Sequence, residues 1–111
     1  MKAENIISVN NARQFNQLYE KELVIARTEE GTPRDNLAWS ILLFGNDYII
    51  YKQEPKNDSS FYPIILTKVR AMDSIAKALD FTKKIGCSKF CIKDHDVYVD
   101  DLSYNEVLNR I

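Results

Sequence analysis

The hydrophobic residues near the N-terminus form short groups separated by polar residues. Those within residues 6–9 predict a short edge strand, and the spacing over residues 15–22 predicts a helix with its apolar side chains on one stripe. Asn10 or Asn11 is the expected N-cap, because an Asn side chain accepts a hydrogen bond from a free backbone N–H of the first turn. The apolar run 23–27 fits either a last helical turn or a strand, and we favour the strand.

Apolar residues in the middle of the chain predict a β-hairpin. Its strands cover residues 37–44 and 48–53 and flank a Gly-Asn-Asp turn. An earlier turn is predicted over residues 29–33, which contain Gly and Pro. After a polar loop, residues 61–69 predict a further strand. Pro63 must lie at its start or at a sheet edge, because proline has no N–H to donate to the ladder.

Two helices are predicted in the C-terminal half. Residues 72–85 have apolar side chains near helical spacing, polar N-cap candidates at 73–74, and Gly86 at the position where helices often end in a left-handed residue. A short C-terminal helix starts at Ser103, which forms a capping box with Glu106. In this motif each side chain satisfies a backbone N–H of the first turn.

Between these helices, residues 89–93 and 97–100 predict a second hairpin. Strands and helices together predict an α+β fold, an antiparallel sheet of four to six strands with two or three helices packed on one face. The face opposite the helices would then be the natural binding surface. Residues 1–111 are expected to form a single domain, because the length is typical of one domain and no linker or repeat interrupts the pattern.

Composition places the chain among folded globular proteins, with 45% hydrophobic and 28% charged residues. No apolar run reaches the ~20 residues of a membrane span, and the first residues lack the pattern of a secretory signal, so we expect a cytoplasmic protein that does not bind membranes. Cys87 and Cys91 are too few for a disulfide scaffold or an all-cysteine zinc site and are expected to be reduced. Frequent Asn, Ile, Lys, Asp and Tyr are typical of AT-rich coding sequences, as in many phages and some bacteria.

Charge is distributed unevenly along the chain, although the formal net charge is only −1. Residues 52–93 carry nine Lys or Arg and four Asp or Glu, whereas residues 94–111 carry one Arg and five acidic residues. Residues 1–51 carry five basic and seven acidic residues and are weakly acidic. A charged ligand responds to the local field of a surface, so the basic middle segment keeps nucleic acid and acidic proteins among the candidate partners.

A nucleic-acid interface is one hypothesis for the basic segment. Lysines on one side of the 73–85 helix would supply phosphate contacts, and an exposed tyrosine of the 48–53 strand would supply base stacking. The set comprises Tyr48, Tyr51, Lys52, Arg70, Lys77, Lys83, Lys84, Lys89 and Lys93. The alternative is that these lysines only solvate the outer faces of helices and strands. No RNP motif, helix-turn-helix signature or arginine-rich arm supports the interface.

A metal-dependent enzyme is a weaker hypothesis. It would use Asp94, His95 and Asp96, which gather oxygen ligands and the only histidine at one hairpin end. The spacing does not match an EF-hand, and Asp side chains commonly accept backbone N–H bonds in polar turns. No P-loop, GxGxxG motif or nucleophile elbow is present, so whether the protein is an enzyme stays open, with a non-enzyme favoured.

The sequence therefore favours a small, non-catalytic binding or regulatory protein, of the inhibitor or accessory type, that engages another macromolecule. We expect a protein partner or self-association, because separated regions of opposite charge suit both. Direct nucleic-acid binding by the lysine-rich segment is the main alternative. No cofactor is expected.

Overall fold

The computed structural model describes residues 4–19, 22–27, 39–56, 63–94 and 97–110. This part of the chain forms seven strands and three helices. In chain order they are β1 (Ile6–Val9), α1 (Ala12–Tyr19), β2 (Glu22–Arg27), β3 (Trp39–Phe44), β4 (Asp47–Pro55), β5 (Ile64–Met72), α2 (Ile75–Lys84), β6 (Lys89–Asp94), β7 (Val97–Leu102) and α3 (Tyr104–Arg110).

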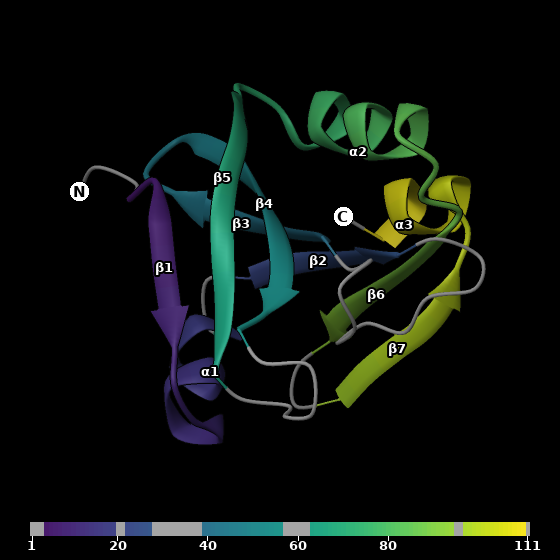
Figure 1. Cartoon of the computed structure of the whole chain (residues 1–111). Coiled ribbons are helices and arrows are strands. Elements are labelled where there is room, and N and C mark those ends of the chain that lie inside the picture. Colours follow the sequence, from purple (N-terminus) through teal and green to yellow (C-terminus); the bar gives the residue numbers. More distant parts are fainter. Residues whose placement is uncertain (1–3, 20–21, 28–38, 57–62, 95–96, 111) are drawn as a thin grey trace.

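All seven strands belong to one antiparallel sheet with the order β1-β5-β4-β3-β2-β6-β7 (Figure 1). The α+β class is confirmed, but the expected four to six strands were too few. Every segment predicted as a strand contributes a strand to the sheet, including the short runs 6–9 and 23–27. β1 pairs with β5 and β2 pairs with β6, both distant in sequence. Long-range pairing of this kind leaves no local signal in the residue pattern.

The sheet buries apolar side chains on both faces. On one face α2 and α3 pack against the α2–α3 core, which consists of Val24, Ala26, Ile41, Ile50, Ala78, Leu79, Cys87, Phe90, Ile92, Leu102 and Val107. The other face carries the α1-side core, which consists of Val9, Ile25, Leu42, Ile49, Tyr51, Ile64, Leu66 and Cys91.

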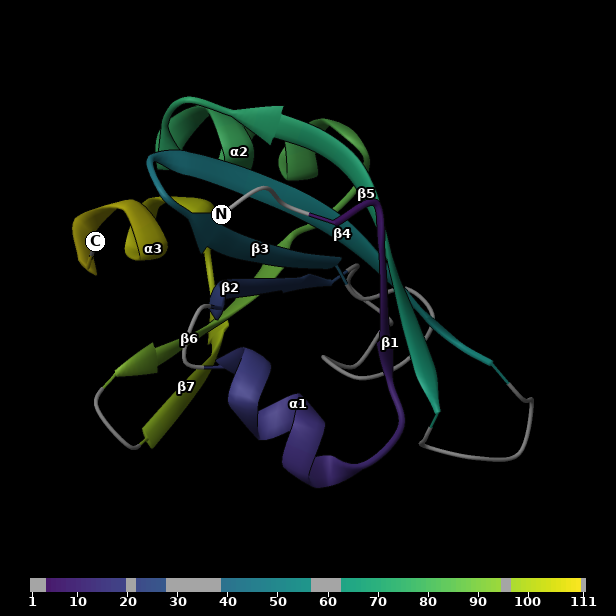
Figure 2. The same cartoon turned by 90° about the vertical axis from the view of Figure 1, so that its left-hand side faces the viewer.

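Figure 2 shows α1 on the opposite side of the sheet from α2 and α3. The expectation that the helices pack on one face is therefore wrong. Consecutive residues of the central strands point to opposite sides, so an uninterrupted apolar strand such as β2 needs cover on both. The sheet face opposite α2 and α3 carries buried residues and is not an open binding surface.

The caps predicted for α2 and α3 are confirmed, whereas α1 ends at Tyr19 and not near residue 22, where β2 begins. The Ser74 hydroxyl accepts a hydrogen bond from the Lys77 N–H (3.2 Å) and caps the start of α2. At the end of α2, Gly86 has φ +103°. The Gly86 N–H donates a hydrogen bond to the Lys83 carbonyl, and the Cys87 N–H donates one to the Thr82 carbonyl. These two bonds define a Schellman motif, which requires the left-handed residue that glycine provides. The capping box of α3 is formed as predicted between Ser103 and Glu106.

The hairpins agree with the sequence pattern at most boundaries. β3 and β4 are joined through Gly45, whose φ of +62° suits the first central position of a tight hairpin turn. Pro63 precedes β5, as its missing N–H requires. The turn predicted over residues 29–33 lies outside the described residues. No helix in the described part of the chain is long and apolar enough to cross a membrane.

Candidate functional site

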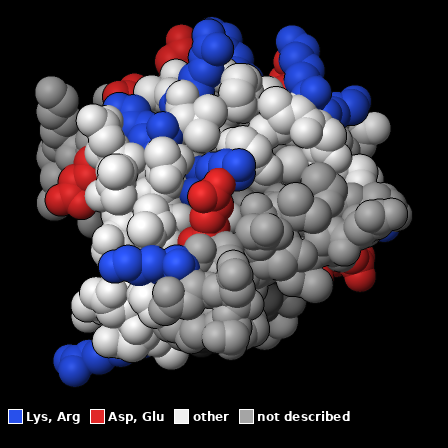
Figure 3. Space-filling view, viewed as in Figure 1, with Lys and Arg blue, Asp and Glu red and all other residues white. Residues whose placement is uncertain are grey.

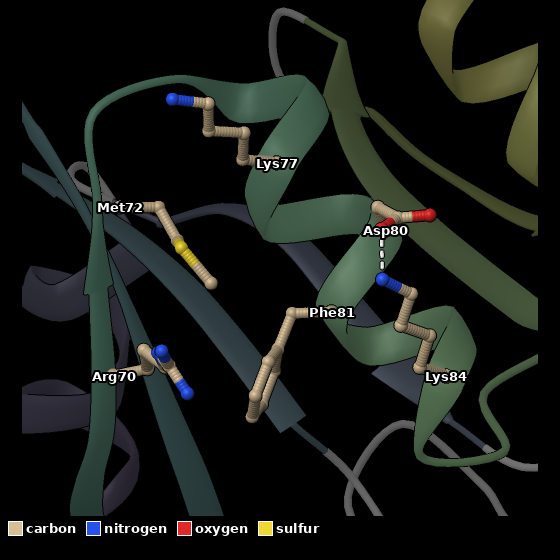
Figure 4. A pocket seen from close by; sticks show the side chains of 6 residues that line it. All are labelled: Arg70, Met72, Lys77, Asp80, Phe81 and Lys84. Atoms are coloured by element: carbon tan, nitrogen blue, oxygen red, sulfur yellow. Dashed lines mark ion pairs between the residues drawn. The ribbon is translucent and has the colours of Figure 1, made fainter.

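A groove of about 390 Å³ lies between β5 and α2. We call it the β5–α2 groove. Figure 4 shows its lining side chains, which come from the last part of β5 and from α2. They are Arg70, Met72, Lys77, Asp80, Phe81 and Lys84. Three cationic side chains and one carboxylate thus surround an apolar floor made by a methionine and a phenylalanine.

A β-bulge decides that Arg70 faces this groove. Ile50 of β4 pairs with Arg70, whereas the next residue of β4 pairs with Lys68. Val69 is therefore an extra residue in β5, and it reverses which residues of the strand face α2. Before the bulge the even-numbered residues of β5 belong to the α1-side core. After it, Arg70 and Met72 turn to the α2 side of the sheet.

Arg70 makes the most distinctive contact of the groove. Its guanidinium carbon lies 5.7 Å from the centre of the Phe81 ring, within the range of a cation–π interaction. In Figure 4 the two side chains lean toward each other across the gap between β5 and α2. Among the residues that the structure describes, no carboxylate forms an ion pair with Arg70. An oriented, unpaired guanidinium is well suited to bind a carboxylate or phosphate through two parallel hydrogen bonds.

The two lysines of the groove already have acidic partners four residues earlier in the chain, Asp80 within α2 and Asp73 just before it. Lys77 Nζ lies 2.8 Å from Asp73 Oδ1, and Lys84 Nζ lies 3.0 Å from Asp80 Oδ2. The hydrogen bond and charge of Lys77 lower the pKa of the Asp73 carboxyl. Both pairs are solvent-exposed, so water and salt screen them and they contribute little to stability. They reduce the positive field of the groove, yet either lysine can change partner at little cost.

The other predicted basic residues lie elsewhere. Lys83 Nζ sits 4.7 Å from the centre of the Tyr104 ring, between α2 and α3. Lys52 of β4 forms an ion pair with Glu54 (2.9 Å). Lys89 begins β6 and is half-buried. The side chain of Lys93 lies outside the described residues.

Figure 3 shows the cationic side chains of one face in separate groups, several of them beside acidic ones. Of the basic residues proposed from the sequence, the groove brings together Arg70, Lys77 and Lys84. Lys52, Lys83 and Lys89 do not line the groove. The groove thus holds a small cluster of three cations and not a continuous stripe.

The tyrosines proposed for base stacking have other environments. Tyr51 is fully buried in the α1-side core, and its hydroxyl donates to the main-chain carbonyl of Glu4 (2.6 Å). Burial, with a smaller contribution from the Glu4 charge, raises the pKa of Tyr51. Tyr48 packs partly buried against the α2–α3 core. Tyr51 therefore cannot stack on a base, because the sheet face that it occupies is covered.

The metal hypothesis is not tested by the structure. His95, Asp96 and the Asp94 side chain lie outside the described residues, and among the residues that are described no three His, Cys, Asp or Glu side chains cluster as a metal site would require. Cys87 and Cys91 are buried and are not joined in a disulfide. Burial raises the pKa of Cys87 to about 11, so this thiol is poorly suited to act as a nucleophile.

Sequence reasoning identified Arg70 as basic but not as the centre of a site. Met72 was assigned to the helical pattern of residues 72–85, although it is the last residue of β5, and Phe81 was not singled out. The missing information was the bulge at Val69, because without it simple alternation places Arg70 on the wrong side of the sheet.

Comparisons with known protein families, with curated proteins and with solved structures found no match to this chain. Function is therefore inferred from the side chains themselves. The β5–α2 groove is where charge, an oriented guanidinium and accessible apolar surface occur together in the described part of the molecule.

Proposed function

We propose that this protein is a small binding protein, of the inhibitor or accessory type, that holds a protein partner through the β5–α2 groove. The observation that carries the proposal is the Arg70 guanidinium, which lies over the Phe81 ring without a carboxylate partner among the described residues. A partner that supplies this carboxylate and covers the adjacent apolar floor complements the groove in both charge and polarity.

The expected ligand is an acidic segment of a protein with an apolar side chain next to an Asp or Glu. Its carboxylate would pair with Arg70, and its apolar side chain would cover Met72 and Phe81. Lys77 and Lys84 would add weaker attraction at the rim, because their present ion pairs are exposed and easily exchanged. Arginine and aromatic residues are the types that most often dominate binding energy in protein interfaces.

Charge distribution favours a protein segment over nucleic acid. Binding to a nucleic-acid backbone depends on several cations that follow successive phosphates. Here Lys77 and Lys84 each form an ion pair with the carboxylate four residues before it, and Lys83 lies over the Tyr104 ring outside the groove. The buried position of Tyr51 also removes one of the two expected stacking platforms. A single site for one or two anionic groups fits this arrangement better.

Selection from a displayed library of random peptides tests the proposal directly. We expect enriched peptides to carry Asp or Glu beside an aromatic or aliphatic residue and to bind the wild type with a Kd of ~10–100 µM, as befits a short ligand. Loss of a charge-assisted bidentate contact in Arg70→Ala should weaken binding by ~10- to 100-fold. Arg70→Lys should recover only part of the loss, because an ammonium cannot form the same fork.

Lys83→Ala is the matched control, since it removes a cation from the same helix outside the groove. Its affinity for the selected peptides should equal that of the wild type, and amide NMR shifts on peptide addition should map to Met72 and Phe81. Peptides that bind Arg70→Ala equally well would refute the groove as the binding site. Tight binding of single-stranded DNA or RNA that falls steeply with salt would instead support the nucleic-acid hypothesis.

A further inference from the structure

The two edges of the sheet differ in how they are protected. β1 and β7 are the terminal strands of the sheet order. In β7, Phe90 pairs with Leu102 but Ile92 pairs with Val99, so β7 contains one extra residue. Asp101, within this bulge, has φ +58°. A bulge with charged residues is a common device that prevents a sheet edge from pairing with another strand.

β1 has none of these devices. Its sequence Ile-Ile-Ser-Val has no charged residue and no proline, and it pairs with β5 in one uninterrupted register. Ile6 is 59% exposed, so its side chain adds apolar surface at this edge. Figure 2, which turns this edge toward the viewer, shows no helix or strand of the described residues in front of β1. As far as the described residues show, no other element occupies this edge, and its backbone groups are open to pairing.

The ladder with β5 determines which backbone groups of β1 are available. The Lys68 N–H donates to the Asn5 carbonyl (2.7 Å), and Asn5 pairs with β5 in the same register as β1. In an antiparallel ladder alternate residues bond to the same neighbour. Asn5, Ile7 and Val9 therefore direct their N–H and C=O groups toward β5. Ile6 and Ser8 direct theirs outward.

Contacts at both ends limit this open stretch. Glu4 and Asn10 are the next residues in the outward-facing series. The Glu4 carbonyl accepts the Tyr51 hydroxyl, and the Asn10 N–H donates to Gln14 Oε1 (2.8 Å). The free edge thus consists of two N–H and two C=O groups, those of Ile6 and Ser8.

We infer that β1 pairs with β1 of a second copy of this chain across a two-fold axis. When two copies run antiparallel with Ile7 opposite Ile7 of the other copy, Ile6 of each lies opposite Ser8 of the other. All four outward groups of each strand then form hydrogen bonds, four in total. A strand whose free groups are satisfied by its own copy is self-complementary, as a two-fold interface requires.

A second copy is favoured over a foreign strand because the edge has no feature that would select one. It carries no charge and no side-chain pocket in the described residues, whereas its hydrogen-bonding groups are symmetric about Ile7. Two-fold pairing also closes on itself. Pairing of β1 with β7 would build an open filament, and the bulge at Asp101 opposes it.

Amide hydrogen exchange of the wild type tests this arrangement at the level of single residues. A four-residue strand gives a small interface, so we expect a Kd of ~100 µM. The amides of Ile6 and Ser8 should then exchange about fourfold more slowly at ~1 mM than at ~10 µM protein. The amides of Ile7 and Val9 already bond β5, and their exchange should not depend on concentration.

Two sets of variants test the geometry. Ser8→Pro removes an outward N–H and leaves the hydrogen bonds between β1 and β5 in place. This variant should be monomeric by sedimentation at ~1 mM, whereas the control Ser8→Ala should dimerise like the wild type. Ile7→Cys should form a disulfide-linked dimer under mild oxidation, because the two Cα atoms face each other across the axis at ~4.5 Å. Ile6→Cys should not, because its two copies are offset along the strands.

The inference is overturned if the wild type is monomeric at ~1 mM and the exchange of Ile6 and Ser8 is independent of concentration. It is equally overturned if folded Ser8→Pro dimerises as well as Ser8→Ala, or if Ile6→Cys crosslinks as readily as Ile7→Cys. Should Ser8→Pro fail to fold by circular dichroism, the exchange and crosslinking results decide. The β5–α2 groove lies at a different place, so failure here leaves the proposed peptide site intact.

Discussion

Tyr51 offers a sensitive test of how the N-terminal strand is held. Its ring is buried in the α1-side core, and its hydroxyl donates a 2.6 Å hydrogen bond to the Glu4 carbonyl, just before β1. Tyr51→Phe removes only the hydroxyl and keeps the ring, including its tilted contact with Phe44 at 6.5 Å between centroids. The substitution therefore isolates one hydrogen bond between residues that are 47 positions apart in the chain.

The expected loss of unfolding free energy is ~1 kcal/mol, the usual net value of one such bond. Glu4 is exposed, so water can reach its carbonyl in the variant and the loss should not exceed ~1.5 kcal/mol. In a domain of 111 residues this corresponds to a decrease in Tm of ~4 °C. Tyr51→Ala, which also leaves a cavity, should cost ~3–5 kcal/mol.

The pH dependence provides an independent check. Burial raises the pKa of Tyr51 in the folded protein, so the unfolded chain loses this proton first. Its contribution to stability is fully present below the unfolded pKa of ~10 and is lost as the pH rises toward the folded pKa. Tyr51→Phe has no such proton, so the stability difference between wild type and variant should shrink above pH ~10.

Urea unfolding monitored by circular dichroism, at neutral pH and in a series above pH ~9, measures both effects. Amide exchange should also show faster opening of β1 in Tyr51→Phe. Unchanged stability would refute the idea that this bond holds the N-terminal segment. A loss as large as that of Tyr51→Ala would show instead that the hydroxyl acts through core packing.

Two further predictions concern buried polar and ionisable groups. Gln53 is 1% exposed, and among the described residues neither side-chain amide atom has a hydrogen-bond partner. Gln53→Leu should therefore raise the unfolding free energy by ~1–2 kcal/mol in urea titrations. A decrease in unfolding free energy would show instead that the side-chain amide forms hydrogen bonds in solution, for example to an ordered water. The Cys87 thiol, with a folded pKa of about 11, should react with iodoacetamide at pH ~8 about 100-fold more slowly in the native than in the unfolded protein. The raised pKa of Cys87 also predicts that the free energy of unfolding falls as the pH rises from ~9 to ~11, and Cys87→Ala should reduce this decline. A native thiol that reacts with iodoacetamide as fast as the unfolded one would contradict the raised pKa.

Much of the secondary structure could be predicted from the sequence because its causes are local. Ser74 and Gly86 define the ends of α2 through bonds to residues a few positions away. The capping box at Ser103 and the tight turn at Gly45 act over similarly short distances. Even the ambiguous run 23–27 is a strand, as favoured from its composition.

The candidate site could be predicted only in part. The sequence identified Arg70, Lys77 and Lys84 as basic, and periodicity placed the lysines on one side of a helix. It did not show that each lysine pairs with the acid four residues before it while Arg70 lies over Phe81. Which cation has a partner depends on side-chain positions in space, and residue types alone do not specify them.

The sequence by itself determined the α+β class, the helix caps and most strand positions. Only the tertiary structure decided that seven strands form one sheet with helices on both faces, that the bulge at Val69 turns Arg70 toward α2, and that β1 is a terminal strand of the described sheet. The physical reason is the range of the interactions. Caps and turns arise from hydrogen bonds within a few residues, whereas strand order, register and the burial of Tyr51 arise from contacts between segments that are distant along the chain.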